Sequence, residues 1–291
     1  METSELLKKV RKIEIRSKGL TNQVFTGSYH SAFKGRGMSF SEVRNYTYGD
    51  DVRAIDWNVT ARFDEPFVKV FEEERELTVM LLIDVSKSSY FGTKSQFKQE
   101  FMAEIAAVLA FSAIQNNDKV GVLFFSDQVE KYIPPKKGKK HVLLIIRELL
   151  NIEPVKSGTR IDIALEYFNN LVKRRSIAFL MSDFNSESYT DALRITSKRH
   201  DIIGLHIYDP MEKELPEIGL VQMEDLESGK RIWVDTNERA TRRGFAEHFE
   251  KHRERHEKDF YRLKADFLSL DTSESYISAL MQLFKKRGHR R

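Results

Sequence analysis

LTVMLLIDVSKS, residues 77–88, is an apolar run that stops abruptly at an aspartate and two alternating serines. Residues 77–83 carry no charge, which is typical of a strand buried on both faces of a parallel sheet. The polar turn therefore follows the strand's carboxyl end, where ligands bind in open α/β sheets. Asp84, Ser86 and Ser88 offer a carboxylate and two hydroxyls, hard oxygen donors that Mg²⁺ accepts. The sequence predicts that this turn holds a divalent cation.

The chain on either side of this turn alternates apolar strands with helical patterns. Three more short apolar runs predict buried strands, at residues 119–126, 176–181 and 202–208. Helical patterns lie between or beside them, at residues 97–114, 141–150 and 161–172. This alternation predicts an α/β fold with a doubly wound, mainly parallel sheet and helices on both faces. Residues 129–133, before Pro134 and Pro135, are typical of an edge strand, because proline cannot donate to a ladder.

Two parts of the chain depart from this alternation. Residues 1–76 are expected to form an amino-terminal module, with a helix at 3–16 and a strand at 67–71 that pairs antiparallel with the central strand. Residues 77–291 form the α/β domain in this interpretation. Within it, residues 209–236 predict an inserted β-hairpin around the turn 227–230. A long charged helix at 238–262, a strand at 267–270 and a helix at 273–284 follow.

Two further oxygen donors follow from the predicted sheet. Thr159 stands just before a helix and Asp183 directly after the strand 176–181, so both are expected beside Asp84, Ser86 and Ser88. Two carboxylates balance the charge of a divalent cation, Mg²⁺ or Mn²⁺. The coordination position that these residues leave open suits the carboxylate of a partner protein. Hydrolysis by a metal-activated water is the alternative, but it needs a general base, and these three loops contain no histidine.

The segment 46–62, YTYGDDVRAIDWNVTAR, concentrates charged residues. Such a concentration is either a catalytic cluster or an ion-pair and capping network that fixes a loop. No histidine or activated nucleophile stands beside it, so we interpret it as a structural network. Its members are Asp50, Asp51, Arg53, Asp56, Trp57 and Arg62.

Composition excludes several classes of function. The 291 residues include 48 basic and 44 acidic ones, so the net charge of +4 gives little reason to expect a nucleic-acid partner, and the basic tail 285–291 is expected to be a solvated end. The chain has no cysteine and no apolar run near the roughly 18 residues of a membrane span, and we expect a cytoplasmic protein. His248, His252 and His256 share one face of a helix, a geometry that can bind zinc. Histidines that pack in the core or face solvent are the better interpretation.

The five oxygen donors resemble the metal-ion-dependent adhesion site of von Willebrand factor A domains, and DKVGVLFFSD at 118–127 resembles the second strand of that fold. GDDVRAIDWNVTAR at 49–62, with the EERE before the central strand, Pro134-Pro135 and Gly138, resembles the bacterial domain-of-unknown-function 58 family over nearly the whole chain. One departure is Phe184, which follows Asp183 where von Willebrand A domains usually have glycine, and which is expected to crowd the site.

The resemblance implies a von Willebrand A-like fold and a link with MoxR-type AAA+ ATPases, but no known reaction. The sequence thus leads to a metal-dependent, protein-binding adaptor as the expected function. A metal-dependent hydrolase that uses the same site, helped by Asp50, Asp51 or Asp56, is the alternative.

Overall fold

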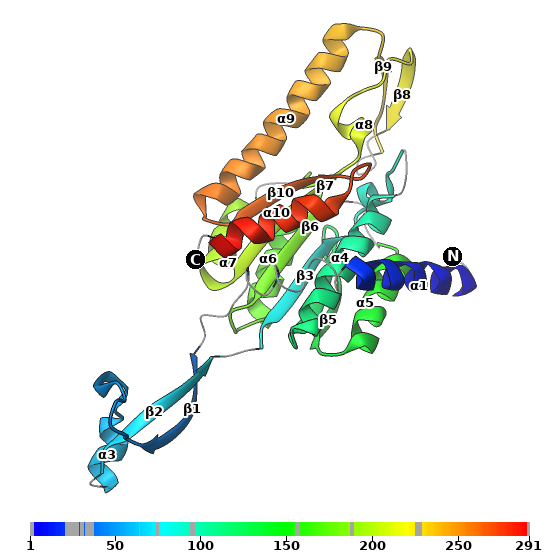
Figure 1. Ribbon diagram of the computed structural model, residues 1–291. Coiled ribbons are helices and arrows are strands. Elements are labelled where there is room, and N and C mark those ends of the chain that lie inside the picture. The colour runs from blue at the N-terminus through cyan, green and yellow to red at the C-terminus, as the bar shows by residue number, and fades with distance from the viewer. Residues whose placement is uncertain are drawn as a thin grey trace.

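A six-stranded sheet forms the centre of the computed structural model, with strand order β10-β7-β6-β3-β4-β5 (Figure 1). The structure describes residues 3–20, 29, 32, 38–63, 65–73, 76–93, 97–154, 158–186, 189–224 and 229–289. The strands of this sheet are β3 (Thr78–Asp84), β4 (Lys119–Phe125), β5 (Val129–Lys136), β6 (Ile177–Ser182), β7 (Asp201–Tyr208) and β10 (Asp266–Asp271).

Five of these strands run parallel and one runs antiparallel. β3 lies between β4 and β6 and pairs in parallel with both. β7 continues the parallel arrangement from β6 to β10. β5 pairs antiparallel with β4 at the edge and contains Pro134 and Pro135, where missing amide donors are tolerated. The predicted α/β class, with a mainly parallel, doubly wound sheet, is confirmed.

Helices cover both faces of the sheet. Along β3, Leu81 belongs to one hydrophobic core and Leu82 to the other, because successive side chains of a strand point to opposite faces. The first core is covered by α1 (Thr3–Leu20), α4 (Lys98–Gln115), α5 (Lys139–Asn151) and α10 (Tyr276–His289). The second is covered by α6 (Ile161–Leu171), α7 (Thr190–Arg199) and the end of α9 (Arg239–Arg262).

The segment before β3 has two parts, one that packs on the α/β domain and one that projects away from it. Helix α1 packs against α4 and α5, and its Val10 and Ile13 belong to the first core. β1 (Met38–Asn45) and β2 (Phe67–Glu73) form a separate antiparallel pair that carries α3 (Trp57–Phe63) and projects away from the sheet (Figure 1). The prediction that the strand at 67–71 pairs with the central strand is wrong, because β4 and β6 occupy both edges of β3.

A second projection follows β7. It consists of the short helix α8 (Pro210–Lys213), the hairpin strands β8 (Leu220–Glu224) and β9 (Arg231–Asp235), and most of α9 (Figure 1). Gly204 of β7 lets the other end of α9 approach the sheet closely. A Cβ atom on Gly204 would lie 2.7 Å from Cζ of Phe260, so a side chain here would displace α9.

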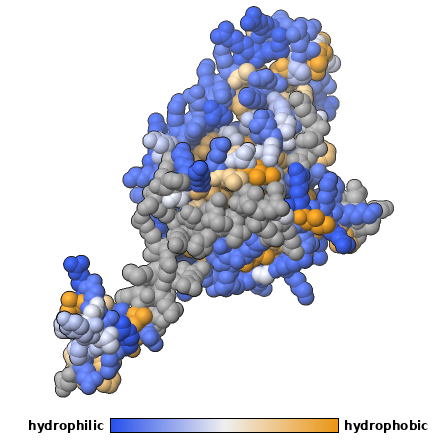
Figure 2. Space-filling model, viewed as in Figure 1, coloured by the Kyte–Doolittle hydropathy of each residue, from blue (hydrophilic) through white to orange (hydrophobic). Residues whose placement is uncertain are grey.

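The surface seen in Figure 2 is largely hydrophilic, with apolar side chains exposed on the β1–β2–α3 projection. Among the described residues of that projection, Val52 and Phe63 are exposed, and 69% of the surface of Trp57 is accessible. No described helix combines the length and the apolar character that a membrane crossing requires.

Candidate metal centre

Asp84 and Asp183 meet at the carboxyl edge of the sheet, where the chain order of the strands reverses. Asp84 is the last residue of β3, and Asp183 follows directly on β6, the neighbouring strand. Hydrogen bonds hold the Asp84 carboxylate in place. The backbone N–H of Ser86 donates to Oδ1 at 2.9 Å, and the Ser182 hydroxyl donates to Oδ2 at 2.6 Å. The site therefore lies in the crevice where doubly wound sheets bind ligands.

The two predicted serines lie together beside these carboxylates. A turn of 3₁₀ helix, Lys87–Tyr90, follows β3 and brings Ser86 Oγ and Ser88 Oγ to 3.0 Å from each other. The Ser89 hydroxyl donates to the carbonyl of Ser86 at 2.7 Å and so fixes the turn. Asp84, Ser88 and Asp183 line a cavity of about 10 Å³, close to the space that one water molecule needs.

Thr159 lies on another of the predicted loops, two residues before α6, and is buried. Its backbone carbonyl accepts a hydrogen bond of 3.0 Å from the hydroxyl of Ser186, on the loop that carries Asp183. Ser186 Oγ also accepts from the backbone N–H of Ile161 at 3.3 Å. The loops of Thr159 and Asp183 are thus tied to each other through Ser186.

Lys98, the first residue of α4, is a part of the site that the sequence did not reveal. Its side chain is 2% exposed, and its ammonium lies 2.9 Å from Asp183 Oδ2 and 2.7 Å from Glu212 Oε1. Burial alone would lower the pKa of Lys98, but the charges of Asp183 and Glu212 outweigh burial and raise it. Lys98 is therefore charged, and it connects the site to α8. Glu212 of α8 also accepts a hydrogen bond of 2.7 Å from the backbone N–H of Asp209.

The two predicted carboxylates differ in their electrostatic environment. Burial, together with the charge of Asp183, raises the pKa of Asp84 to about 6. Burial also acts on Asp183, but the charge of Lys98 and hydrogen bonds from Ser88 and Lys98 outweigh it and lower the pKa of Asp183. A positive charge placed against Asp84 would favour its ionised form.

The residues present fit a divalent cation. Within the described part of the chain, no group of three or more His, Asp or Glu side chains is arranged to hold a metal, so a site here must use hydroxyls as well as carboxylates. Ionised Asp84, Asp183 and Glu212 carry three negative charges, and Lys98 neutralises one of them. The remaining two charges match one Mg²⁺ or Mn²⁺ ion, whose preferred ligands are oxygens.

Phe184 adopts a left-handed backbone conformation, with φ of 58°, for which glycine is usual. Its ring is buried and packs against those of Tyr189, Phe260 and Phe267, at centroid distances of 5.9, 5.7 and 5.3 Å. Phe184 is not among the residues that line the small cavity. Its ring therefore points into the second core instead of crowding the serines.

Comparison with known proteins assigns the chain to a family. The sequence profile of the family described as "Protein of unknown function DUF58" matches residues 42–255, well over half of the chain. The chain belongs to the DUF58 family. Its relatives include the uncharacterized proteins Mb1516 of Mycobacterium bovis and Rv1480 of Mycobacterium tuberculosis. Each is 28% identical over 292 aligned positions, which cover 99% of this chain and 91% of the relative.

Solved structures similar to this DUF58 protein include BatB from Bacteroides thetaiotaomicron and the VWA domain of SpRpn10. BatB gives a TM-score of 0.48 at 20% identity and covers 73% of this chain and 99% of its own. The SpRpn10 domain gives 0.40 at 13% identity and covers 71% and 94%. The sheet described above is the doubly wound, mainly parallel α/β sheet that the sequence predicted.

The charged segment 46–62 of this DUF58 protein lies on the β1–β2–α3 projection. Asp50 accepts two hydrogen bonds of 2.7 Å from the Arg44 guanidinium, and these, with the backbone N–H of Thr47, hold the pKa of Asp50 well below its usual value. Asp51 caps the 3₁₀ helix Val52–Ala54, and Asp56 accepts from the backbone N–H groups of Asn58 and Val59 at the start of α3. Arg53, Trp57 and Arg62 lie exposed nearby.

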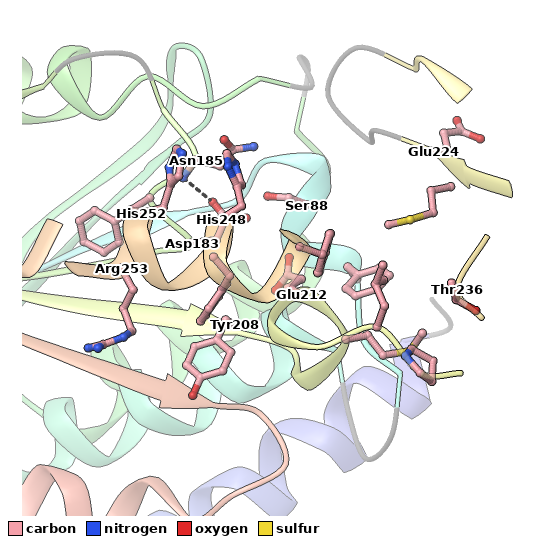
Figure 3. A pocket seen from close by; sticks show the side chains of 18 of the residues that line it. Ser88, Asp183, Asn185, Tyr208, Glu212, Glu224, Thr236, His248, His252 and Arg253 are labelled. Atoms are coloured by element: carbon pink, nitrogen blue, oxygen red, sulfur yellow. Dashed lines mark hydrogen bonds between the residues drawn. The ribbon is translucent and has the colours of Figure 1, made fainter. Parts of the chain in front are cut away.

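The three histidines of α9 lie closer to the predicted site than the sequence indicated. His248, His252 and His256 line a cavity that Ser88 and Asp183 also line. Figure 3 shows His248 and His252 near Asp183. His256 Nδ1 lies 2.7 Å from the hydroxyl of Tyr189, and burial lowers the pKa of His256 to about 4. His206 of β7 lines the same cavity. The folding of α9 over β7 brings them there, a contact between segments that no local sequence pattern predicts.

Proposed function

We propose that this DUF58 protein binds a partner protein through a divalent cation, Mg²⁺ or Mn²⁺, and serves as an adaptor for a MoxR-type AAA+ ATPase in the cytoplasm. The cation would be held by Asp84, Ser86, Ser88, Thr159 and Asp183. The observation that carries the proposal is the charge of the site. The Lys98 ammonium pairs with Asp183 and Glu212, and Asp84 adds a third carboxylate to this region, so its net charge is two negative charges when all three are ionised. The hydroxyls of Ser86 and Ser88 lie 3.0 Å from each other beside Asp84.

Each residue of the site has a distinct part in this proposal. Ser182 and the Ser86 backbone fix the orientation of Asp84, and Lys98 fixes that of Asp183. The hydroxyls of Ser86 and Ser88 supply neutral ligands, so a bound cation keeps the Lewis acidity needed to accept a carboxylate oxygen from the partner. Binding would therefore depend on an acidic side chain of the partner.

Titration calorimetry with Mg²⁺ and Mn²⁺ tests the cation site. The wild type is expected to bind one ion, and both Asp84→Ala and the isosteric Asp84→Asn are expected to lose binding, because the site loses a charged ligand. Asp51→Ala is the matched control, since Asp51 is a carboxylate of the distant projection that caps a 3₁₀ helix. Equal binding by the wild type and Asp84→Asn would contradict the proposed site.

A pull-down with a purified MoxR-type ATPase tests the proposed partner. Retention by the wild type in Mg²⁺, and its loss with EDTA or in Asp84→Asn, is the expected result. Retention that ignores both EDTA and Asp84→Asn would show that the ATPase binds elsewhere on the chain. No retention of the ATPase by a wild type that binds Mg²⁺ would remove the ATPase from the proposal and leave the cation site.

A metal-dependent hydrolase is the second candidate, and the histidines that line the neighbouring cavity favour it. Their ring nitrogens could act as general bases, which the predicted loops lack. Asp50, Asp51 and Asp56 could not assist, since their projection joins the amino end of β3 whereas the site lies at its carboxyl end (Figure 1). Metal-dependent hydrolysis of p-nitrophenyl esters or phosphates that disappears in Asp84→Asn would support this candidate.

A further inference from the structure

A cavity of about 600 Å³ lies beside the metal centre, between the second projection and the end of β7. Ser88 and Asp183 belong to its lining and also to the small cavity of the metal centre. In Figure 3 these two side chains lie on one side, and Glu224 and Thr236 lie across from them. The cavity therefore extends from the metal centre to the hairpin.

The walls of this cavity are mainly apolar. Helix α9 contributes Phe245 and Phe249, and β8 contributes Val221 and Met223. Leu215 lines it from the segment between α8 and β8. An occupant that carries a carboxylate toward the metal centre would thus bury apolar groups along the rest of the cavity, which favours binding in proportion to the area buried.

Strand β8 borders this cavity with its backbone as well as with its side chains. Four consecutive residues, Val221, Gln222, Met223 and Glu224, line it. Because successive side chains of a strand point to opposite faces, a cavity that touches all four residues contacts the backbone or edge of the strand and not only the side chains of one face. Among the described strands, β8 pairs only with β9, so its other edge has no partner strand. Such an edge is able to bind an added strand through its backbone groups.

We propose that this cavity binds an extended segment of a partner protein, which adds to the free edge of β8. The segment places an acidic side chain at the metal centre and a bulky aliphatic side chain between β8 and α9. The inference rests on the proposed function, because the acidic side chain is recognised through the cation. It goes further by assigning the hairpin and α9 a role in choosing the partner sequence.

Fluorescence anisotropy with short labelled peptides tests the inference on the full chain in Mg²⁺. The peptides are blocked octapeptides of Ser, Thr and Gly that contain one Asp and, one to three residues away, one Leu. The best of them is expected to bind at least about tenfold more tightly than its Leu→Gly counterpart, because Leu is buried. Its Asp→Asn counterpart is expected not to bind. Methylation of alternate backbone nitrogens should weaken binding at least about tenfold, because it blocks strand pairing.

Two neighbouring residues of β8 provide matched variants of the protein. Val221 lines the cavity, whereas Leu220 does not line it and is 65% exposed. Val221→Glu is expected to remove the preference for Leu over Gly, and Leu220→Glu is expected to leave it unchanged. Both variants should bind Mg²⁺ as the wild type does, and circular dichroism checks that they are folded. The methylated peptide tests strand pairing without any change to the protein.

The outcomes separate this inference from the proposed function. If the wild type binds Mg²⁺ and the peptides bind regardless of Leu, of Val221→Glu and of backbone methylation, the inference is wrong and the cation site stands. If decanoate binds more tightly than every peptide, the cavity takes a small carboxylate amphiphile, which also overturns the inference. If the wild type binds neither Mg²⁺ nor Mn²⁺, the proposed function and the inference fail together.

Discussion

Lys98 shows how a single residue changes the charge of the candidate metal centre. Its ammonium lies between Asp183 and Glu212, so one positive charge is built into a site whose predicted ligands are all neutral or negative. Glu212 comes from α8, in the segment that the sequence assigned to the inserted hairpin. The two side chains thus connect the metal centre to the projection that borders the large cavity. A cation that binds at Asp183 would compete with Lys98 for the same carboxylate.

Replacement of Lys98 by methionine tests this arrangement. Without metal, Lys98→Met is expected to lower the free energy of unfolding by about 3–5 kcal/mol, because it leaves buried carboxylates without their cation. Mg²⁺ at millimolar concentration should recover much of this loss, since a site with three negative charges binds it more tightly. Urea unfolding with and without Mg²⁺ measures both effects.

Lys119→Met is the control for Lys98→Met. Lys119 forms an exposed ion pair with Glu76, so its loss is expected to change stability by less than about 1 kcal/mol. A large loss in Lys98→Met that Mg²⁺ does not recover would mean that Lys98 stabilises the fold but does not share its carboxylates with a cation.

His200 makes stability depend on pH. It is buried at the end of α7, with Nδ1 3.0 Å from the Ser176 hydroxyl and its ring 4.4 Å from that of Phe168. Burial, with the charges of Arg199 and Arg175, lowers the pKa of His200 to about 4, against about 6.5 in an unfolded chain. The unfolded chain therefore binds a proton below pH 6.5 that the folded chain does not. The contribution of His200 is present above this pH and is lost as pH falls toward 4.

Replacement of His200 by phenylalanine should remove this contribution. Between pH 6.5 and 4, the stability of the wild type should fall more steeply than that of His200→Phe, by up to about 1.4 kcal/mol per pH unit. Asp84 and Asp118, whose pKa values burial raises to about 6, add a slope of the opposite sign, but they do so equally in both proteins. Urea unfolding at pH 4.5, 5.5 and 7.5 measures the difference. Parallel curves would contradict the buried neutral histidine.

Helix α1 lies before residue 76 in the sequence but packs on the α/β domain. Ile13 is 6% exposed and belongs to the core between the sheet, α4 and α5, whereas Ile15 on the same helix is 65% exposed. Ion pairs also join α1 to α4, such as that of Arg16 with Glu104 at 2.8 Å. The helix therefore supports α4, whose first residue is Lys98 of the metal centre.

Alanine substitutions at these two isoleucines test whether α1 is part of the core. Ile13→Ala should lower the free energy of unfolding by about 2–4 kcal/mol, because it removes buried methyl groups and leaves a cavity. Ile15→Ala should change it by less than about 0.5 kcal/mol. Thermal or urea unfolding measures both variants. Equal, small effects would show that α1 folds apart from the α/β domain.

At the level of elements, patterns of local sequence predicted most of the sheet. β3, β4, β6 and β7 were predicted within a residue or two at each end, because a strand buried on both faces is a short uncharged run. β1 was missed, since its sequence MSFSEVRN mixes charged and apolar residues and its partner β2 is distant in the chain. The pairing of β2 could not be predicted either, because it depends on which edges of the sheet other strands occupy.

The placement of the five candidate ligands at one edge of the sheet was predictable for a related reason. Asp84, Ser86, Ser88, Thr159 and Asp183 follow strands or precede a helix, so the fold class alone placed them at one edge. Lys98, Glu212 and the histidines of α9 reach that edge through contacts between distant segments. Local sequence carries no signal for such contacts. Whether the five donors bind a cation stays a prediction that calorimetry decides.

The whole molecule has two projections at different ends of the sheet. The β1–β2–α3 projection joins the amino end of β3, whereas α8, the β8–β9 hairpin and α9 follow the carboxyl end of β7 (Figure 1). The candidate metal centre lies at the carboxyl end, beside the second projection. The first projection exposes Trp57 and Phe63 but contributes no strand to the six-stranded sheet. It is thus placed to act separately from the metal centre.

Excision of the first projection tests this separation. Replacement of residues 38–73 by a short Gly-Ser linker should leave a cooperatively folded protein, because β1 and β2 pair with each other and α3 packs against β2. The midpoint of thermal unfolding should shift by less than about 4 °C, which corresponds to about 1 kcal/mol in a domain of this size. Mg²⁺ affinity by calorimetry should match that of the full chain, since all five predicted ligands remain. A protein that loses cooperative unfolding would show that the projection stabilises the sheet. A stable protein that loses only Mg²⁺ binding would show instead that the two ends of the sheet are coupled.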